Sequence, residues 1–218
     1  DCRAVASKAE YFEISPNESN KTCSLALKAM YKDSLQGKIT IPATVELNGT
    51  NYRVTSITQT GFASTKITHV FFENGSLCES IGDKGFQYCS SLKYVELPNS
   101  LQRIMDASFM GTSLTGIVIP EKVDSIGNYA FFNCESLENF VSNSTKLDYI
   151  GEYAFKNCPL TIIDLSKGVR EIGNGAFDGC TGLTEIKIPA SVTTFGNNIF
   201  YGCNNLVNII AENADKYA

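Results

Sequence analysis

The sequence predicts a solenoid of stacked coils, because one pattern of residues recurs from residue 57 to the end of the chain. The pattern reads I-G-x-x-A-F-x-x-C and continues with an apolar-x-apolar segment and often a proline, as in IGNGAFDGCTGLTEIKIPASVTT at residues 172–194. Its seven copies begin at Ile57, Ile81, Ile104, Ile126, Ile150, Ile172 and Phe195. Consecutive copies start 22 to 24 residues apart, and a fixed period of this length is typical of stacked repeats.

A phenylalanine in every copy supports the same fold class. It lies five residues after the first residue of each copy, at Phe62, Phe86, Phe109, Phe131, Phe155, Phe177 and Phe200. This regular placement predicts a column of stacked rings in the core. One coil buries too few apolar side chains to offset the entropy cost of ordering its backbone, so we expect its stability to come from stacking against neighbours.

The end of each copy reads as a strand. The segments KYVEL at 93–97, TGIVI at 115–119, TIIDL at 161–165 and TEIKI at 184–188 alternate or nearly alternate and are rich in β-branched residues. Because successive copies run in the same direction, we expect these strands to form one parallel sheet. A glycine follows the first residue in five copies and predicts a tight corner or a positive φ there.

Five of the eight cysteines share one position of the repeat, eight residues after its start: Cys89, Cys134, Cys158, Cys180 and Cys203. A small apolar side chain repeated in one slot indicates core packing with reduced thiols. Among the remaining three, Cys2 with Cys23 is the favoured bridge if one forms. No C-x-x-C motif occurs and His69 is the only histidine, so we expect no metal site and no cofactor.

Residues 1–56 lack the repeat and are expected to form an N-terminal β cap, followed by the seven-copy solenoid at residues 57–218. The run CSLALKAMY alternates from Cys23 to Tyr31 and predicts a strand, and GKITIPATV predicts a second strand that Pro42 stops. VELNGTNYRV predicts a hairpin that turns at Asn48-Gly49. A cap is needed because an uncovered first coil would expose core and strand edges.

Composition excludes several classes of function. The chain has 218 residues, of which 43% are hydrophobic and 19% charged, and its net charge is -5. Without a basic stripe it does not fit a nucleic-acid-binding protein. No stretch approaches 18 uninterrupted apolar residues, so we expect no membrane span.

The complete pattern, together with the lead-in GKITIPATVELNGTNYRVTSI, resembles the BspA-type leucine-rich repeat proteins over residues 37–210. The resemblance implies a right-handed leucine-rich repeat solenoid with a parallel β-sheet and short helical turns. It also implies a secreted or cell-surface protein of a host-associated microbe, with a role in adhesion or in binding host or other extracellular proteins. The resemblance supplies no catalytic residues.

Alternation within the strands predicts two outward columns, which are the positions free to carry specificity. One column is His69, Tyr94, Gly116, Asn139, Ile162, Glu185 and Asn208, and the other is Phe71, Glu96, Val118, Val141, Asp164, Lys187 and Ile210. The apolar members form either an exposed patch that marks a partner surface or simply the β-branched residues that strands favour. For a partner-binding surface we nominate Phe71, Tyr94, Val118, Val141 and Ile162.

We therefore expect a non-catalytic extracellular scaffold that recognises a host or matrix protein. The alternative is a carbohydrate-binding or glycan-active surface protein that uses the outward carboxylates Asp164 and Glu185, since a glycosidase needs two such groups about 5–10 Å apart. Lys187 lies beside them and offers a plain surface ion pair. With no pocket-forming insertion between copies, we do not expect an enzyme.

Overall fold

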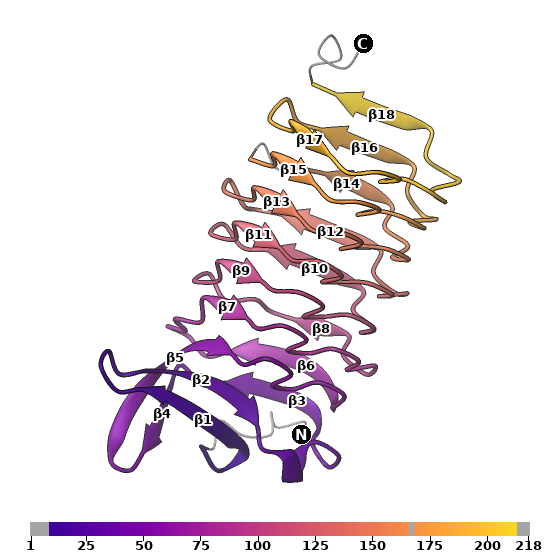
Figure 1. Ribbon diagram of the computed structural model, residues 1–218. Helices are drawn as coiled ribbons and strands as arrows, with labels where there is room; N and C mark the ends of the chain where they lie inside the picture. The colour runs from indigo at the N-terminus through magenta and orange to yellow at the C-terminus, as the bar shows by residue number, and fades with distance from the viewer. Residues whose placement is uncertain (1–8, 166–167, 213–218) are drawn as a thin grey trace.

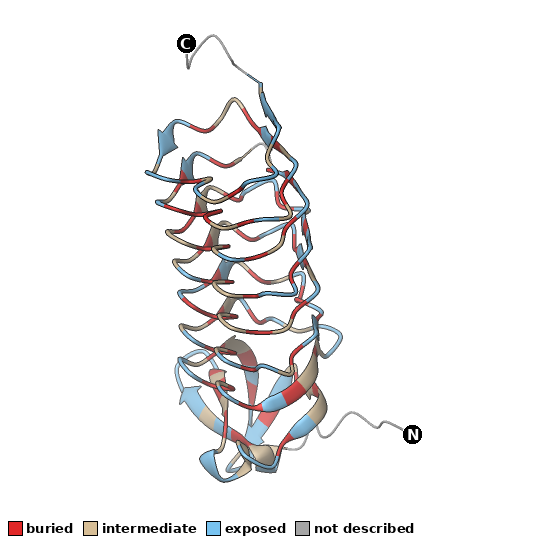
Figure 2. Cartoon of the chain, turned by 90° about the vertical axis from the view of Figure 1, so that its right-hand side faces the viewer, coloured by how far each residue is buried: buried red, intermediate tan, exposed pale blue. Residues whose placement is uncertain are grey.

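The computed structural model describes residues 9–165 and 168–212. Coils stack into one elongated solenoid, with a β cap at the N-terminal end and strand β18 in the last coil (Figure 1). Buried and exposed residues alternate around the coils, as expected when every coil turns its apolar side chains to a common core (Figure 2). The predicted solenoid fold, with parallel strands and an N-terminal β cap, is confirmed.

Two ribbons of parallel strands run along the solenoid, where the sequence predicts one sheet. Ribbon A is formed by the strands that enter each coil: β5 (Thr50–Ile57), β7 (Ser80–Ile81), β9 (Arg103–Ile104), β11 (Ser125–Ile126), β13 (Tyr149–Ile150), β15 (Glu171–Ile172) and β17 (Thr194–Phe195). Six of these strands have two residues each. A strand of two residues cannot be recognised from alternation in the sequence.

Ribbon B contains the strands that the alternation predicts. They are β3 (Gln36–Ile41), β6 (Lys66–Phe72), β8 (Tyr94–Val95), β10 (Gly116–Ile119), β12 (Asn139–Ser142), β14 (Ile162–Asp164), β16 (Glu185–Ile188) and β18 (Asn208–Ala211). Ribbon B is divided into three hydrogen-bonded blocks, β3-β6-β8, β10-β12 and β14-β16-β18. The expectation of one continuous sheet is therefore wrong.

Among the described residues, the connection from ribbon A to ribbon B contains no helix. The expectation of short helical turns is therefore wrong. Positive φ values of 52 to 57° occur three residues after each coil start, at Thr60, Lys84, Ala107, Tyr129, Tyr153, Gly175 and Asn198. A second set, with φ of 56 to 73°, follows four residues later, at Ser64, Tyr88, Gly111, Asn133, Asn157, Gly179 and Gly202. These left-handed residues interrupt any helix and turn backbone N–H groups toward the next coil.

Each connection is held to its neighbour by backbone hydrogen bonds. In the coil that begins at Ile126, the N–H groups of Tyr129, Phe131 and Asn133 donate to carbonyl oxygens of the next coil at 2.8, 2.8 and 2.9 Å. The same three bonds recur between consecutive coils. They satisfy buried backbone groups, and they offset the cost of placing non-glycine residues at positive φ.

The repeated glycine of ribbon A serves close packing rather than a positive φ. None of Gly82, Gly127, Gly151, Gly173 and Gly196 has a positive φ. A Cβ atom at these five positions would lie 2.3 to 2.6 Å from the nearest atom of the preceding coil. Of the two alternatives, a tight corner or a positive φ, the positive φ does not occur, and glycine is required because the backbones of consecutive coils nearly touch.

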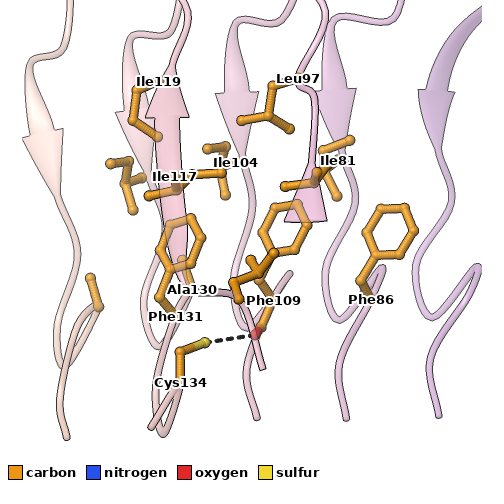
Figure 3. Close-up of a cluster of buried hydrophobic side chains, with 14 of the residues drawn as sticks. Ile81, Phe86, Leu97, Ile104, Phe109, Ile117, Ile119, Ala130, Phe131 and Cys134 are labelled. Atoms are coloured by element: carbon orange, nitrogen blue, oxygen red, sulfur yellow. Dashed lines mark hydrogen bonds between the residues drawn. The ribbon is translucent and has the colours of Figure 1, made fainter. Parts of the chain in front are cut away.

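The core contains the predicted phenylalanine column. The rings from Phe62 to Phe200 stack on one another, with centroids 5.1 to 6.0 Å apart and interplanar angles of 6 to 15°. Isoleucines of both ribbons, such as Ile104 and Ile117, lie in the same core as the rings (Figure 3). The five slot cysteines line the same core as buried free thiols.

The cap closes the first end of this column. Strand β1 (Phe12–Asn17) pairs antiparallel with β2 (Thr22–Leu27), which in turn lies parallel to β5. The ring of Phe12 meets Phe62 edge-on at 6.2 Å and covers the stack. The hairpin of β4 (Thr44–Leu47) and β5 turns at Asn48 and Gly49, both with positive φ, as the sequence predicts.

One strand of the cap ends earlier than the alternation predicts. Strand β2 ends at Leu27, and residues Ala29–Tyr31 form the short 3-10 helix η2; the other, η1, spans Ala9–Tyr11. Cys23 lies buried in β2 as a free thiol. Its expected partner Cys2 lies outside the described residues.

Candidate functional site

Ribbon B presents its alternate residues to solvent in the two predicted columns. Strand pairing places His69 opposite Tyr94 and Gly116 opposite Asn139. In the last block, Ile162 lies opposite Glu185, and Glu185 lies opposite Asn208. The coil that begins at Ile126 follows the same alternation, because Phe140 is buried while Val141 is 49% exposed.

The five nominated partner-binding residues all lie on this face, and four of them are close together. Tyr94, Val118, Val141 and Ile162 are 45%, 52%, 49% and 56% exposed, and Phe71 is half-buried. Tyr94, Val118 and Val141 line one hollow, and Phe71 joins them through a ring contact with Tyr94 at 5.8 Å. Ile162 belongs to the next hydrogen-bonded block and does not line the hollow.

Three aromatic rings cluster at one side of the hollow. His69 lies 6.3 Å from Phe71 and 6.1 Å from Tyr94, measured between ring centroids. His69 Nδ1 is also 2.9 Å from the hydroxyl oxygen of Thr68, which fixes the orientation of the imidazole ring. The cluster forms a semi-rigid apolar surface with a polar edge, the kind of surface that aromatic residues provide at interfaces.

The hollow lies where ribbon B is divided, between β8 and β10. Its volume is about 530 Å³. Gly116 lies between Tyr94 and Asn139 in the outward column, and its missing side chain leaves the space open. Tyr94, Val118 and Val141 supply the apolar walls, and the asparagines at the rim are Asn99, Asn139 and Asn143.

A second hollow of about 290 Å³ adjoins the first. Strand β8 ends at Val95, although the N–H of Glu96 still donates to the carbonyl oxygen of Val70 at 3.0 Å. Glu96, Leu97 and Asn99 line both hollows. Glu73 lines the second hollow. Within the described ranges Glu96 makes no ion pair or side-chain hydrogen bond, whereas Glu73 Oε2 accepts one from the N–H of Ala43 at 2.9 Å.

The carboxylates of the alternative hypothesis already have partners. Lys187 Nζ lies 3.6 Å from Asp164 Oδ2, and Asn208 Nδ2 donates to Glu185 Oε2 at 2.8 Å. Neither carboxylate lines the hollow at Gly116. Their side chains therefore form surface contacts, and the contact of Asp164 is the ion pair that the presence of Lys187 suggested.

Neither a metal site nor a membrane-spanning helix occurs in the described part of the chain. No group of three or more His, Cys, Asp and Glu residues that could hold a metal ion is found within residues 9–165 and 168–212. In the same residues, no helix has both the length and the apolar character required to cross a bilayer.

Sequence reasoning missed the hollow and the special position of Glu96. Both depend on the division of ribbon B after β8. Alternation within a strand predicts which residues face outward, but it does not predict where neighbouring strands separate. One observation pointed to the place: Gly116 is the single glycine in either outward column, and a glycine inside a strand often marks a close approach or an opening.

Comparison with known proteins agrees with this architecture. The chain matches the family described as "BspA type Leucine rich repeat region" in 6 copies, over residues 43–138 and 102–217. No curated protein matches it at a significant level.

Solved bacterial structures share the fold. The crystal structure of the T. pallidum leucine-rich repeat protein superposes with a TM-score of 0.80 at 27% identity, covering 92% of this chain and 90% of that one. The pneumococcal vaccine antigen PcpA superposes with a TM-score of 0.54 at 14% identity, covering 91% of this chain and 67% of that one.

Proposed function

Because the chain belongs to the BspA-type leucine-rich repeat family, we propose that it is a non-catalytic binding scaffold that recognises a host or matrix protein outside the cell. In this proposal the protein is secreted or held at a cell surface. The binding surface is the outward face of ribbon B around the hollow at Gly116.

The observation that carries the proposal is the exposed apolar and aromatic group around that hollow. Tyr94, Val118 and Val141 are each about half exposed although inward positions of the same strands are buried. Interfaces concentrate affinity in a few aromatic or apolar anchors that fit pockets, and exposed apolar patches with a polar rim mark partner surfaces. A solenoid holds such a group on a stiff, extended support.

A recognition role also agrees with the contacts of the outward carboxylates. A glycoside hydrolase would need one carboxyl group as a general acid and another as a nucleophile or base, facing each other across a bound sugar. Asp164 pairs with Lys187 and Glu185 with Asn208, so neither side chain is arranged for that work. Glycan binding without catalysis stays the second candidate, because the rings of His69, Phe71 and Tyr94 offer a surface on which a sugar ring could pack.

The test is a binding screen against a panel of purified extracellular matrix proteins and, in parallel, a glycan panel. A titration of the captured protein then compares the wild type with the double variant Val118→Glu, Val141→Glu. Both side chains are exposed, so circular dichroism should show an unchanged fold. We expect affinity to fall by at least about tenfold, equivalent to 1.4 kcal/mol.

Unchanged affinity in a folded double variant would move the site away from this face. Capture of glycans alone, with loss of binding in the same variant, would replace the protein ligand by a carbohydrate on the same surface.

A further inference from the structure

From the two adjoining hollows we infer the chemistry of the partner: an extended protein segment with one apolar side chain next to a lysine or arginine. The apolar side chain enters the hollow at Gly116, and the cation pairs with Glu96. This inference rests on the proposed function, which assigns the outward face of ribbon B to protein binding.

The apolar half of the inference follows from the shape and walls of the larger hollow. The hollow has a volume of about 530 Å³, and Gly116, which has no side chain, lines it between Tyr94 and Asn139. A Cβ atom built at Gly116 would lie 3.4 Å from its nearest neighbour, the Cβ of Asn139, and the φ of Gly116 is not positive. The strand would therefore accept a larger residue without strain, and the glycine matters for the space that it leaves.

Exposed apolar walls make this space a docking site for an apolar group. Tyr94, Val118 and Val141 expose 45%, 52% and 49% of their surface. Covering such surface removes apolar area from water, which stabilises a complex in proportion to the area buried. A side chain inserted here would cover part of these walls, which is how an anchor residue acts at an interface.

The cationic half follows from the charges that line the hollows. Among the described residues that line either hollow, Glu73 and Glu96 are the charged ones, and none is lysine, arginine or histidine. Glu73 already accepts a hydrogen bond from the backbone of Ala43, while the exposed carboxylate of Glu96 has no partner within residues 9–165 and 168–212. A cation brought to Glu96 gains a charge-assisted contact.

The same charges argue against an acidic ligand. A carboxylate, phosphate or sulfated sugar entering the hollows would face two like charges with no cation to neutralise them. Like-charge contacts of this kind select against the wrong partner. The net charge of -5 on the chain adds a weak attraction for basic partners at low ionic strength.

Short peptides provide a probe that needs no knowledge of the natural partner. We would titrate the full chain with the capped peptide Gly-Ser-Leu-Arg-Ser-Gly and with two versions, one with Gln in place of Arg and one with Ser in place of Leu. Amide chemical shifts report the contact site, at peptide concentrations up to about 5 mM, where weak contacts are still measurable. We expect shifts centred on Tyr94, Gly116 and Val141.

Three variants separate the two halves of the inference. Glu96→Gln should lower the affinity for the Leu-Arg peptide by about fivefold, the scale of a partly exposed charge pair. Its affinity for the Leu-Gln peptide should not change. Glu96→Lys should bind a fourth peptide, with Glu in place of Arg, more tightly than it binds the Leu-Arg peptide. Gly116→Val should narrow the hollow between Tyr94 and Asn139 and weaken the binding of all peptides that contain leucine, in a protein that remains folded.

The matched control is Glu171→Gln, which removes the same charge from an exposed strand residue of ribbon A. It should bind every peptide as the wild type does. The inference is overturned if no shifts appear around Gly116, if Glu96→Gln weakens both peptides equally, or if Gly116→Val leaves the leucine peptides unaffected. If the Val118→Glu, Val141→Glu variant loses a matrix protein while Glu96→Gln and Gly116→Val keep it, the proposed function stands and this inference fails.

Discussion

The thiol of Cys134 donates a hydrogen bond to the backbone carbonyl oxygen of Phe109 in the preceding coil, with 3.1 Å between Sγ and O (Figure 3). The other four slot cysteines make the same contact at 3.0 to 3.3 Å. Thr65 and Thr112 occupy the slot in the two coils that lack cysteine, and their hydroxyls lie within 3.4 and 3.2 Å of the next thiol. The slot therefore selects small side chains that pack as apolar groups and also form hydrogen bonds.

Two substitutions at Cys134 separate packing from hydrogen bonding. Valine and threonine have similar shapes, but only threonine keeps a donor, as Thr112 does in the neighbouring coil. Cys134→Val should lower the free energy of unfolding by about 0.5–1.5 kcal/mol, because Phe109 O keeps its bond from the N–H of Thr112. Cys134→Thr should cost less than that. Urea unfolding followed by circular dichroism measures both, and equal losses would mean that the hydrogen bond contributes nothing.

The slot cysteines should resist thiol reagents in the native protein. They are buried, and the reacting species is the thiolate. Burial raises the pKa of Cys158 and also raises the pKa of Cys78, outside the slot, to about 12. The raised pKa of Cys158 keeps its thiol protonated at pH 8. Burial also acts to raise the pKa of Cys134, but hydrogen bonds with Cys158 and Thr112 lower it, so the protection of Cys134 rests on its burial.

The control for labelling is Glu135→Cys, which places an exposed thiol next to Cys134. We expect full reaction of the introduced cysteine before Cys134, Cys158 or Cys180 react, as measured by intact-mass analysis, and reaction of all cysteines in denaturant. Rapid native modification of the three slot cysteines would show that the slot is exposed.

Periodicity predicted the features that every coil must share. The Phe155 ring column, the slot of Cys134 and the outward position of Val141 repeat with the coil, so each is supported by several copies of the pattern. The hairpin at Asn48 was also predictable, because its turn residues determine the local conformation.

Features that depend on contacts between coils were not predictable in the same way. The repeated glycine was expected at a tight corner or at a positive φ. The left-handed conformations occur instead at residues such as Tyr129 and Tyr153, and the side chains of these residues do not indicate such a conformation. Hydrogen bonds to the next coil impose that conformation. The hollow at Gly116 likewise depends on the division of ribbon B between β8 and β10, and one strand's sequence does not encode its spacing from the next.

Loss of a central ring should cost more than loss of the last ring. Phe155 is fully buried and stacks between Phe131 and Phe177 with centroid distances of 5.1 and 5.6 Å. Phe200 is partly buried and, among the described residues, stacks on Phe177 alone, at 6.0 Å. Phe155→Ala should therefore lower the free energy of unfolding by about 3–5 kcal/mol, and Phe200→Ala by clearly less. Denaturant titration tests this, and equal losses would argue against a stack that is weaker in its last described coil.

Two glycine substitutions give the sharpest test of how the coils pack. At Gly151 a Cβ atom would lie 2.5 Å from the backbone nitrogen of Asn128 and the carbonyl carbon of Gly127, so Gly151→Ala forces consecutive coils apart. We expect a loss of about 1–3 kcal/mol in the free energy of unfolding, the usual cost of overpacking. At Gly116 the nearest atom would be 3.4 Å away and φ is not positive, so Gly116→Ala should be neutral or raise stability by up to about 1 kcal/mol. Urea unfolding compares the two variants with the wild type. Neither position has a positive φ, so the two substitutions differ mainly in the contact with the preceding coil. A similar loss of stability at both would mean that this contact is not what requires glycine at residue 151.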